Sequence, residues 1–269
     1  MTSTRPIARL ALALLIGCCT SVAQPCSVSR VLDAPYDLGN TWGFYGEVVG
    51  HVSMRIPGCE KVTYEDICSP SWGLKIRILQ PLNATARSAA EVEYFNFDTA
   101  SDCGPRPVGQ HKIESAYPVG TRVALAASLF AWDQPIPPRI RLTSLRPVIG
   151  EAIFVVPKGA DLRALSAVAF DYAGTLHGRR FALARDERAR INFEIWRDTL
   201  RVQDARSEAE ALPVLLRMAA AVDVVGVFQE DPYYTAIEQL VDRYLPTPGV
   251  RAQFARQLPA VYATADVGK

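Results

Sequence analysis

The sequence predicts an α+β protein: a small all-β barrel or sandwich comes first, and a mostly helical region follows. Short segments of alternating apolar and polar residues, separated by polar turns, concentrate before residue 150. Beyond that point the apolar spacing becomes helical and helix-start signals appear. The composition agrees, because 49% hydrophobic residues are enough to build a core.

The N-terminal segment has the pattern of a secretory signal peptide. Arg5 and Arg9 form a basic head without acids, and an apolar run follows over residues 10–19. That run has about half the ~20 residues that a membrane-spanning helix needs. Residues 21–23, Ser-Val-Ala, present small side chains at the two positions that signal peptidase reads, which predicts cleavage after Ala23.

A second cleavage site is possible, and the number of cysteines that each site leaves helps to choose between them. Residues 15–18, Leu-Ile-Gly-Cys, look like the lipobox of bacterial lipoproteins, in which Cys18 would become the lipidated first residue. Lipidation there leaves Cys19 as an odd thiol, whereas cleavage after Ala23 leaves an even set of four cysteines. Parity favours the ordinary cut. The predicted localisation is periplasmic or secreted, and a membrane-anchored lipoprotein is the alternative.

Five segments before residue 146 are predicted strands. They are residues 41–54, 74–82, 91–97, 120–128 and 139–145, and one last strand is expected within 151–157. In the first segment Val48 and Val52 are assigned to the apolar face and His51 to the opposite face. The glycines that interrupt this segment favour a strand that bends sharply or carries a bulge.

The C-terminal part is predicted to be mainly helical. Asp231 followed by Pro232, and Thr247 followed by Pro248, are typical helix starts. Ser207 and Glu210 form a capping box, although a proline at 213 could delay that helix by a turn. Residues 161–200 fit either period. The predicted division is a signal peptide (1–23), a barrel domain with disulfides (24–149) and a mainly helical domain (150–269).

The first half resembles a known family. Cys26 precedes a Trp-Gly-Phe-Tyr-Gly-Glu-Val-Val strand, and a strand ending in Ile-Leu-Gln-Pro-Leu follows. Next come Asp-Cys-Gly around Cys103 and then Tyr-Pro-Val-Gly-Thr-Arg-Val. This order, over residues 26–145, is similar to the OB-fold domain shared by tissue inhibitors of metalloproteinases and netrin-type modules. The resemblance implies a five-stranded OB-like barrel.

The resemblance also implies a disulfide between Cys26 and Cys103. Four cysteines allow three connectivities, so spacing alone does not choose among them. Cys59 and Cys68 flank a polar excursion between two predicted strands, and a bridge between them could close it. The inhibitors begin with Cys-x-Cys and chelate the target's zinc through the first residue, whereas here Val28 stands at the second cysteine position. Metalloprotease inhibition is therefore not predicted.

No catalytic, cofactor-binding or metal-binding residue is predicted. The histidines are His51, His111 and His177, with the last two expected in loops, and none has a second ligand at metal spacing. Nucleophile-elbow, phosphate-loop and dinucleotide motifs are absent from the sequence. Asn83 begins a glycosylation sequon, which has meaning only in a eukaryotic secretory pathway.

Two functions are considered. The first is a secreted or periplasmic module that binds another envelope or extracellular protein. The alternative is an envelope hydrolase whose acid–base pair is assembled from separate carboxylates and a histidine, and an enzyme is the less favoured of the two. With a net charge of +1, nucleic acid is not an expected partner, and no segment after the leader approaches a membrane span.

Overall fold

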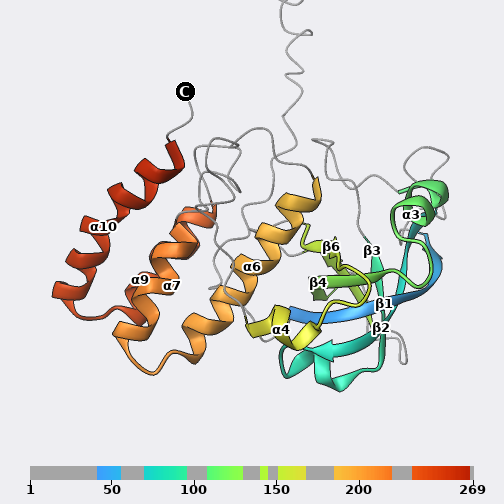
Figure 1. The fold of residues 1–269 in the computed structure, drawn as a ribbon, viewed down its shortest axis with the longest axis horizontal. Coiled ribbons are helices and arrows are strands. Elements are labelled where there is room, and N and C mark those ends of the chain that lie inside the picture. The colour runs from blue at the N-terminus through green and yellow to red at the C-terminus, as the bar shows by residue number, and fades with distance from the viewer. Residues whose placement is uncertain are drawn as a thin grey trace, which may run out of the picture.

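A computed structural model describes residues 41–55, 70–95, 108–129, 140–144, 151–167, 185–219 and 232–266 (Figure 1). The leader, both possible processing sites, His177 and every cysteine lie outside these residues. The disulfide pairings of Cys26 with Cys103 and of Cys59 with Cys68 therefore stay predictions. The division at residue 150 also stays a prediction.

Within the described residues, strands come first and helices follow, so the predicted α+β class is confirmed. The strands are β1 (Thr41–Met54), β2 (Ser71–Pro81), β3 (Glu91–Phe95), β4 (Arg122–Leu129), β5 (Arg141–Ser144) and β6 (Ile153–Val155). The helices are η3 (Thr85–Ser88), α3 (Gln110–Ala116), α4 (Leu162–Ala167), α6 (Arg185–Asp204), α7 (Glu208–Ala219), α9 (Pro232–Tyr244) and α10 (Pro248–Asp266).

The strands close into a small barrel. The order β1-β2-β3-β5-β4 returns to β1, because β1 pairs with both β2 and β4. β3 and β5 run parallel, and the other pairs are antiparallel. β6 pairs with β4 alongside the short β5. A closed five-stranded barrel with a helix between its third and fourth strands is OB-like.

Two register shifts in the β1–β2 pair determine which way β1 faces. One lies between Tyr45 and Gly46, and the other lies between Val48 and Gly50. The predicted bulge is therefore present, and the extra residue Val49 reverses the alternation of the strand beyond it. As a result His51 lies opposite Leu74, a residue of the barrel interior, and Val52 packs outside with Phe95 and Met54. The predicted faces of His51 and Val52 were wrong for this reason.

The barrel interior is filled by apolar side chains. Phe44, Val48, Ile76, Val123 and Leu125 are each fully buried there. Helix α3 contributes Ile113, and Tyr117 follows at its C-terminal end. Sequence periodicity did not predict α3, which is only seven residues long. His111 lies in this helix and not in a loop.

The later helices begin where the sequence indicates. The predicted starts at Pro232 and Pro248 are confirmed. The Ser207 Oγ accepts a hydrogen bond from the Glu210 backbone N–H at 3.3 Å, as in a capping box. Pro213 does not delay α7, which begins at Glu208 and contains the proline. The ambiguous stretch 161–200 contains α4 and most of α6.

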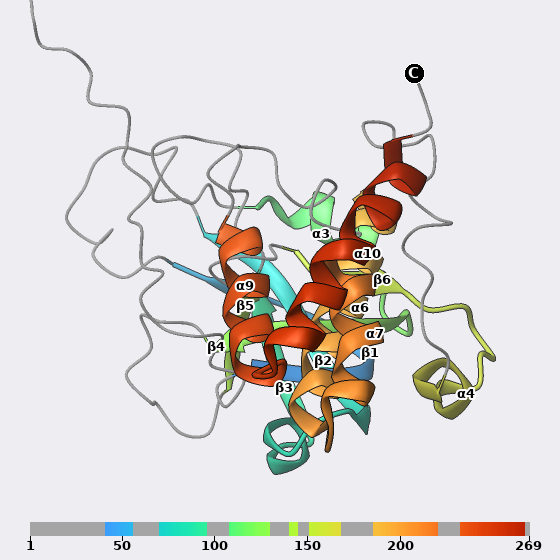
Figure 2. The same ribbon diagram turned by 90° about the vertical axis from the view of Figure 1, so that its left-hand side faces the viewer.

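Helix α6 is the central element of the helical layer. Figures 1 and 2 show α6 beside the sheet, with α7 and α9 beyond it and α10 outermost. α6 packs on β6 and β4 on one side and on α7 and α9 on the other. Its middle is therefore buried almost all round, including Phe193, Ile195 and Trp196.

A cradle of small residues on the outside of the barrel receives α6. Gly43 on β1 lies opposite Ala126 on β4, and both belong to the outer face. A Cβ built on Gly43 would overlap the indole ring of Trp196. The Trp196 Nε1 donates a hydrogen bond to the Thr41 Oγ1 at 3.2 Å. The Phe193 ring packs beside Trp196, with centroids 5.9 Å apart. Glycine is needed here because the ring lies directly against the backbone.

Candidate functional site

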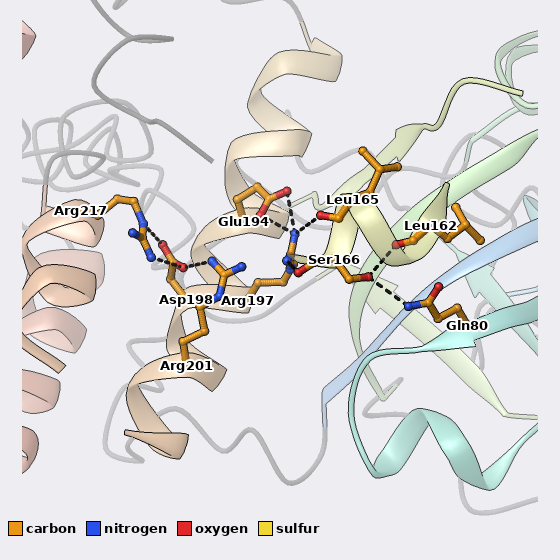
Figure 3. Close-up of polar contacts among 9 residues, drawn as sticks. All are labelled: Gln80, Leu162, Leu165, Ser166, Glu194, Arg197, Asp198, Arg201 and Arg217. Atoms are coloured by element: carbon orange, nitrogen blue, oxygen red, sulfur yellow. Dashed lines mark hydrogen bonds and ion pairs between the residues drawn. The ribbon is translucent and has the colours of Figure 1, made fainter. Parts of the chain in front are cut away.

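The largest cluster of charged side chains in the described interior lies on α6 (Figure 3). Glu194, Arg197 and Asp198 are all buried, although they sit in a helix whose other buried side chains are mostly apolar. A buried charge is tolerated only when it is paired and hydrogen-bonded. Their partners therefore show what the cluster does.

Arg197 fastens α4 to α6. Its Nη1 donates to the Glu194 carboxylate at 2.9 Å and to the Leu165 carbonyl at 3.3 Å. Its Nη2 donates to the carbonyl of Ser166. The Ser166 hydroxyl donates to the Leu162 carbonyl at 2.8 Å and accepts from the Gln80 Nε2 at 3.1 Å. The cluster thus joins β2 of the barrel, α4 and α6.

Asp198 joins α6 to α7. Its side chain is only 1% exposed. Arg217 of α7 donates to both carboxylate oxygens at 2.6 and 2.7 Å. Arg201, one helical turn further along α6, donates to the Oδ1 at 2.6 Å. This is the bidentate arginine–carboxylate geometry that makes strong, well-oriented pairs.

Burial sets the electrostatics of the cluster. It raises the pKa of Glu194, an effect that the charge of Arg197 opposes. It also raises the pKa of the neighbouring Tyr45 hydroxyl, which Arg197 again opposes. Because the cluster is buried and its contacts run between elements of the fold, we assign it a structural role.

Sequence reasoning missed these residues, although a signal was present. Glu194 with Arg197, and Asp198 with Arg201, are opposite charges three residues apart in a helix. Such spacing places two side chains on one helix face. The large apolar residues between them indicated burial, but only the packing of α7 and α4 identifies the remaining partners.

The two described histidines, which the sequence offered as candidates for an acid–base site, lie apart from each other. The His51 Nε2 donates to the Tyr117 carbonyl at 2.9 Å, which closes the α3 end of the barrel. His111 is exposed on α3. The two histidines are thus in separate settings, one half-buried and one at the surface.

The amide of Asn83, in the predicted sequon, ties the β2–β3 connection to β1. Its Nδ2 donates to the Thr41 carbonyl at 2.9 Å. Its Oδ1 accepts from the backbone N–H of Ala86 at 3.1 Å and of Gly43 at 3.4 Å. Both ends of the side chain are occupied, so its role in the fold is structural.

A second polar group joins the barrel to the start of α6. Arg185 donates two hydrogen bonds of 2.8 Å to the Glu151 carboxylate. The Asn192 Nδ2 donates to the Glu151 carbonyl at 2.7 Å. Burial, assisted by the charge of Glu151, raises the pKa of Tyr117. These contacts too hold elements together.

The outer face of β2, β3 and β5 has a different character, and we name it the charged face. It consists of Lys75 and Arg77 on β2, Glu91 and Glu93 on β3, and Arg141 on β5. Lys75, Glu93 and Arg141 lie opposite one another across the three strands. Arg77 lies opposite Glu91, so bases alternate with acids in both rows.

Ion pairs connect the members of the charged face. The Lys75 Nζ lies 2.8 Å from the Glu91 carboxylate, and the Arg141 Nε lies 3.2 Å from that of Glu93. The hydrogen bond from Lys75 lowers the pKa of Glu91. Arg77, 3.9 Å from Glu91, is more than half exposed. The strand that carries Lys75 and Arg77 was predicted from the sequence, whereas the acids opposite them were not.

Neither a metal cluster nor a membrane helix is found in the part of the chain that the structure describes. No three His, Cys, Asp or Glu residues gather there in a way that could hold a metal ion. None of the described helices combines the length and the apolar character needed to cross a bilayer.

These features define a class: a closed, OB-like five-stranded barrel with a helical C-terminal region packed on one side of it. Comparison of the chain with protein families, with curated proteins and with solved structures found no match.

Proposed function

We propose that this chain is a secreted or periplasmic protein-binding module, and that its partner is another envelope or extracellular protein. The observation that carries the proposal is the contrast between the two outer sides of the barrel. One side is covered by α6, whereas on the charged face Lys75, Arg77 and Glu91 are each more than a third exposed, although Glu93 is buried. Surfaces held on a closed sheet are pre-organised for recognition, which reduces the entropy lost on binding.

The resemblance to tissue inhibitors of metalloproteinases and netrin-type modules supports the same class. The closed barrel and the helix between β3 and β4 are compatible with that resemblance. We propose the relation for the barrel only. The departure at Val28 from the Cys-x-Cys start argues against zinc chelation by the N-terminus.

The test is quantitative capture of a partner by the mature, tagged full chain from an envelope extract. The captured protein is then purified and titrated against the chain by calorimetry. Saturable binding with a fixed stoichiometry supports the proposal. If no protein is retained beyond the level of a tagged unrelated barrel, the binding module is wrong.

The hydrolase alternative predicts a different result. Replacement of His111 or His177 by alanine would abolish a measurable turnover while leaving folding intact. His51→Ala is the less informative variant, because the His51 ring makes a hydrogen bond at the α3 end of the barrel.

A further inference from the structure

We propose that the charged face is the docking surface, and that it recognises an acidic protein surface with basic residues interspersed. This inference rests on the proposed function, since it names the site and the kind of partner. It follows from the exposure of the charges and from their order across the strands.

The cations on β2 are the groups that project farthest into solvent. Side-chain exposure is 56% for Arg77 and 45% for Lys75. Their acidic partners are more covered, with 38% for Glu91 and 11% for Glu93. A long basic side chain extends past a shorter glutamate, so an approaching molecule meets the positive heads first.

The order of charges extends the surface onto β1 and β4. Glu47 on β1 lies opposite Arg77 of β2 and also opposite Arg122 of β4. Glu93 is buried and pairs with Arg141, so these two are left out of the balance. The remaining members are three bases, Lys75, Arg77 and Arg122, and two acids, Glu47 and Glu91. The excess of a single charge favours a partner that is acidic but mixed.

A nucleic acid fits this surface less well than a protein does. A polyanion gains affinity by replacing counterions around unopposed cations. Here Glu91 lies 2.8 Å from Lys75 and 3.9 Å from Arg77, so a row of phosphates would face these carboxylates. A protein can place acids against Arg77 and Lys75 and a base against Glu91, and such complementarity gives specificity.

The barrel also offers an apolar contact beside the charges. Leu79 lies two residues beyond Arg77, at the register shift in β2, and is 39% exposed. On the opposite side of the barrel, α6 covers Gly43 and Ala126. Interfaces combine such an apolar contact with a polar rim.

Three fluorescent probes test the proposal on the mature full chain at low ionic strength. They are the peptide (Glu-Glu-Lys)5, the charge-inverted peptide (Lys-Lys-Glu)5 and a single-stranded 15-mer DNA. We expect saturable binding of the acidic peptide and at least tenfold weaker binding of the other two probes. Binding of the acidic peptide should be lost as salt is raised.

The double variant K75E/R77E should lose at least tenfold in affinity for the acidic peptide. The matched control is R163E/R256E, which makes the same change of charge at exposed residues of α4 and α10. Circular dichroism and thermal melts of both variants establish that they fold.

Three outcomes overturn the proposal: no binding of the acidic peptide, equal losses in the two double variants, or preference for DNA. The proposed function fails separately. A captured partner whose affinity is unchanged in K75E/R77E leaves the binding module standing and removes the charged face. If the acidic peptide binds but no partner is captured, the charged face stands as a site for acidic peptides and the binding module is wrong.

Discussion

The two outer sides of this barrel are made by strands with the same alternation, but a helix packs on one side and exposed charged residues lie on the other. Where α6 covers β1 and β4, the outward positions include the small residues Gly43, Ala124 and Ala126, and Trp196 of the helix packs directly against Gly43. On β2 and at the start of β3 the outward positions carry Lys75, Arg77 and Glu91, each more than a third exposed, whereas Glu93 and Phe95 further along β3 are buried. Small outward residues thus allow a helix to pack closely on the strands, whereas long charged residues that pair with one another stay at the surface.

The largest expected effect comes from emptying the covered side. Trp196→Ala removes a fully buried indole from the cradle, and we expect a loss of about 3–5 kcal/mol in unfolding free energy. Denaturant titration measures it. Gly43→Val, which fills the same place from the other side, is expected to cost about 1–3 kcal/mol through overpacking. If Trp196→Ala changes stability no more than Arg77→Ala, the two sides do not differ as described.

The α6–α7 contact gives the next effect. Asp198→Asn leaves Arg201 and Arg217 facing a neutral side chain, and breaking a buried pair in this way should cost about 3 kcal/mol. Thermal melts of the variant measure the loss. Asp242→Asn is the control, because Asp242 pairs with Arg251 at a largely exposed position. Equal losses in the two variants would contradict the structural role of Asp198.

The hydrogen bonds of Asn83, which join the β2–β3 connection to β1, should contribute less to stability than Trp196 or Asp198. Asn83→Ala removes three partly buried hydrogen bonds, of 2.9, 3.1 and 3.4 Å. We expect the unfolding free energy to fall by about 2 kcal/mol. Thr85→Ala also destroys the sequon but keeps the Asn83 amide, so it should cost less. Denaturant titration of both variants separates the structural role of the amide from any role as a modification site.

The buried carboxyl of Glu194 predicts a pH dependence. Its pKa is raised in the folded state, so the folded state holds this proton more tightly than the unfolded state. Its contribution to stability is complete below the ordinary glutamate pKa of about 4.3 and is lost as pH rises through the folded value. We expect the wild type to lose stability relative to Glu194→Gln from about pH 4 upward. The prediction is wrong if the unfolding free energy of the wild type, relative to that of Glu194→Gln, stays constant or rises with pH.

The smallest effect is expected on the charged face. Glu91 is solvated, and Lys75 lowers its pKa, so what stability it adds is present above its unfolded pKa and is lost as pH falls through the folded value. Glu91→Gln should leave the neutral-pH melting temperature unchanged within error and flatten only the acid limb of the stability curve. A large loss at neutral pH would mean that this face is packed rather than open.

Local pattern was enough to predict several elements of the fold. Short strand-like segments before residue 146 located β1 to β5, since a half-buried strand alternates apolar and polar residues, and one last strand was expected where β6 lies. Proline after a capping residue located the first residues of α9 and α10, because proline lacks the N–H that a helix start leaves unpaired. On α9, Ile237 and Leu240 are apolar residues at helical spacing, and both pack in the helical core.

The α+β order, with a barrel followed by helices, is thus predictable from local pattern, because strand and helix periods depend on near neighbours in the chain. Contacts between distant segments set the remaining features. The bulge at Val49 turned His51 toward the interior, and no residue type encodes that phase. Gly43 became a seat for Trp196, and Asp198 found Arg217, across long stretches of chain. Such partners are selected by packing between whole elements, and the alternation along any one segment contains no information about them.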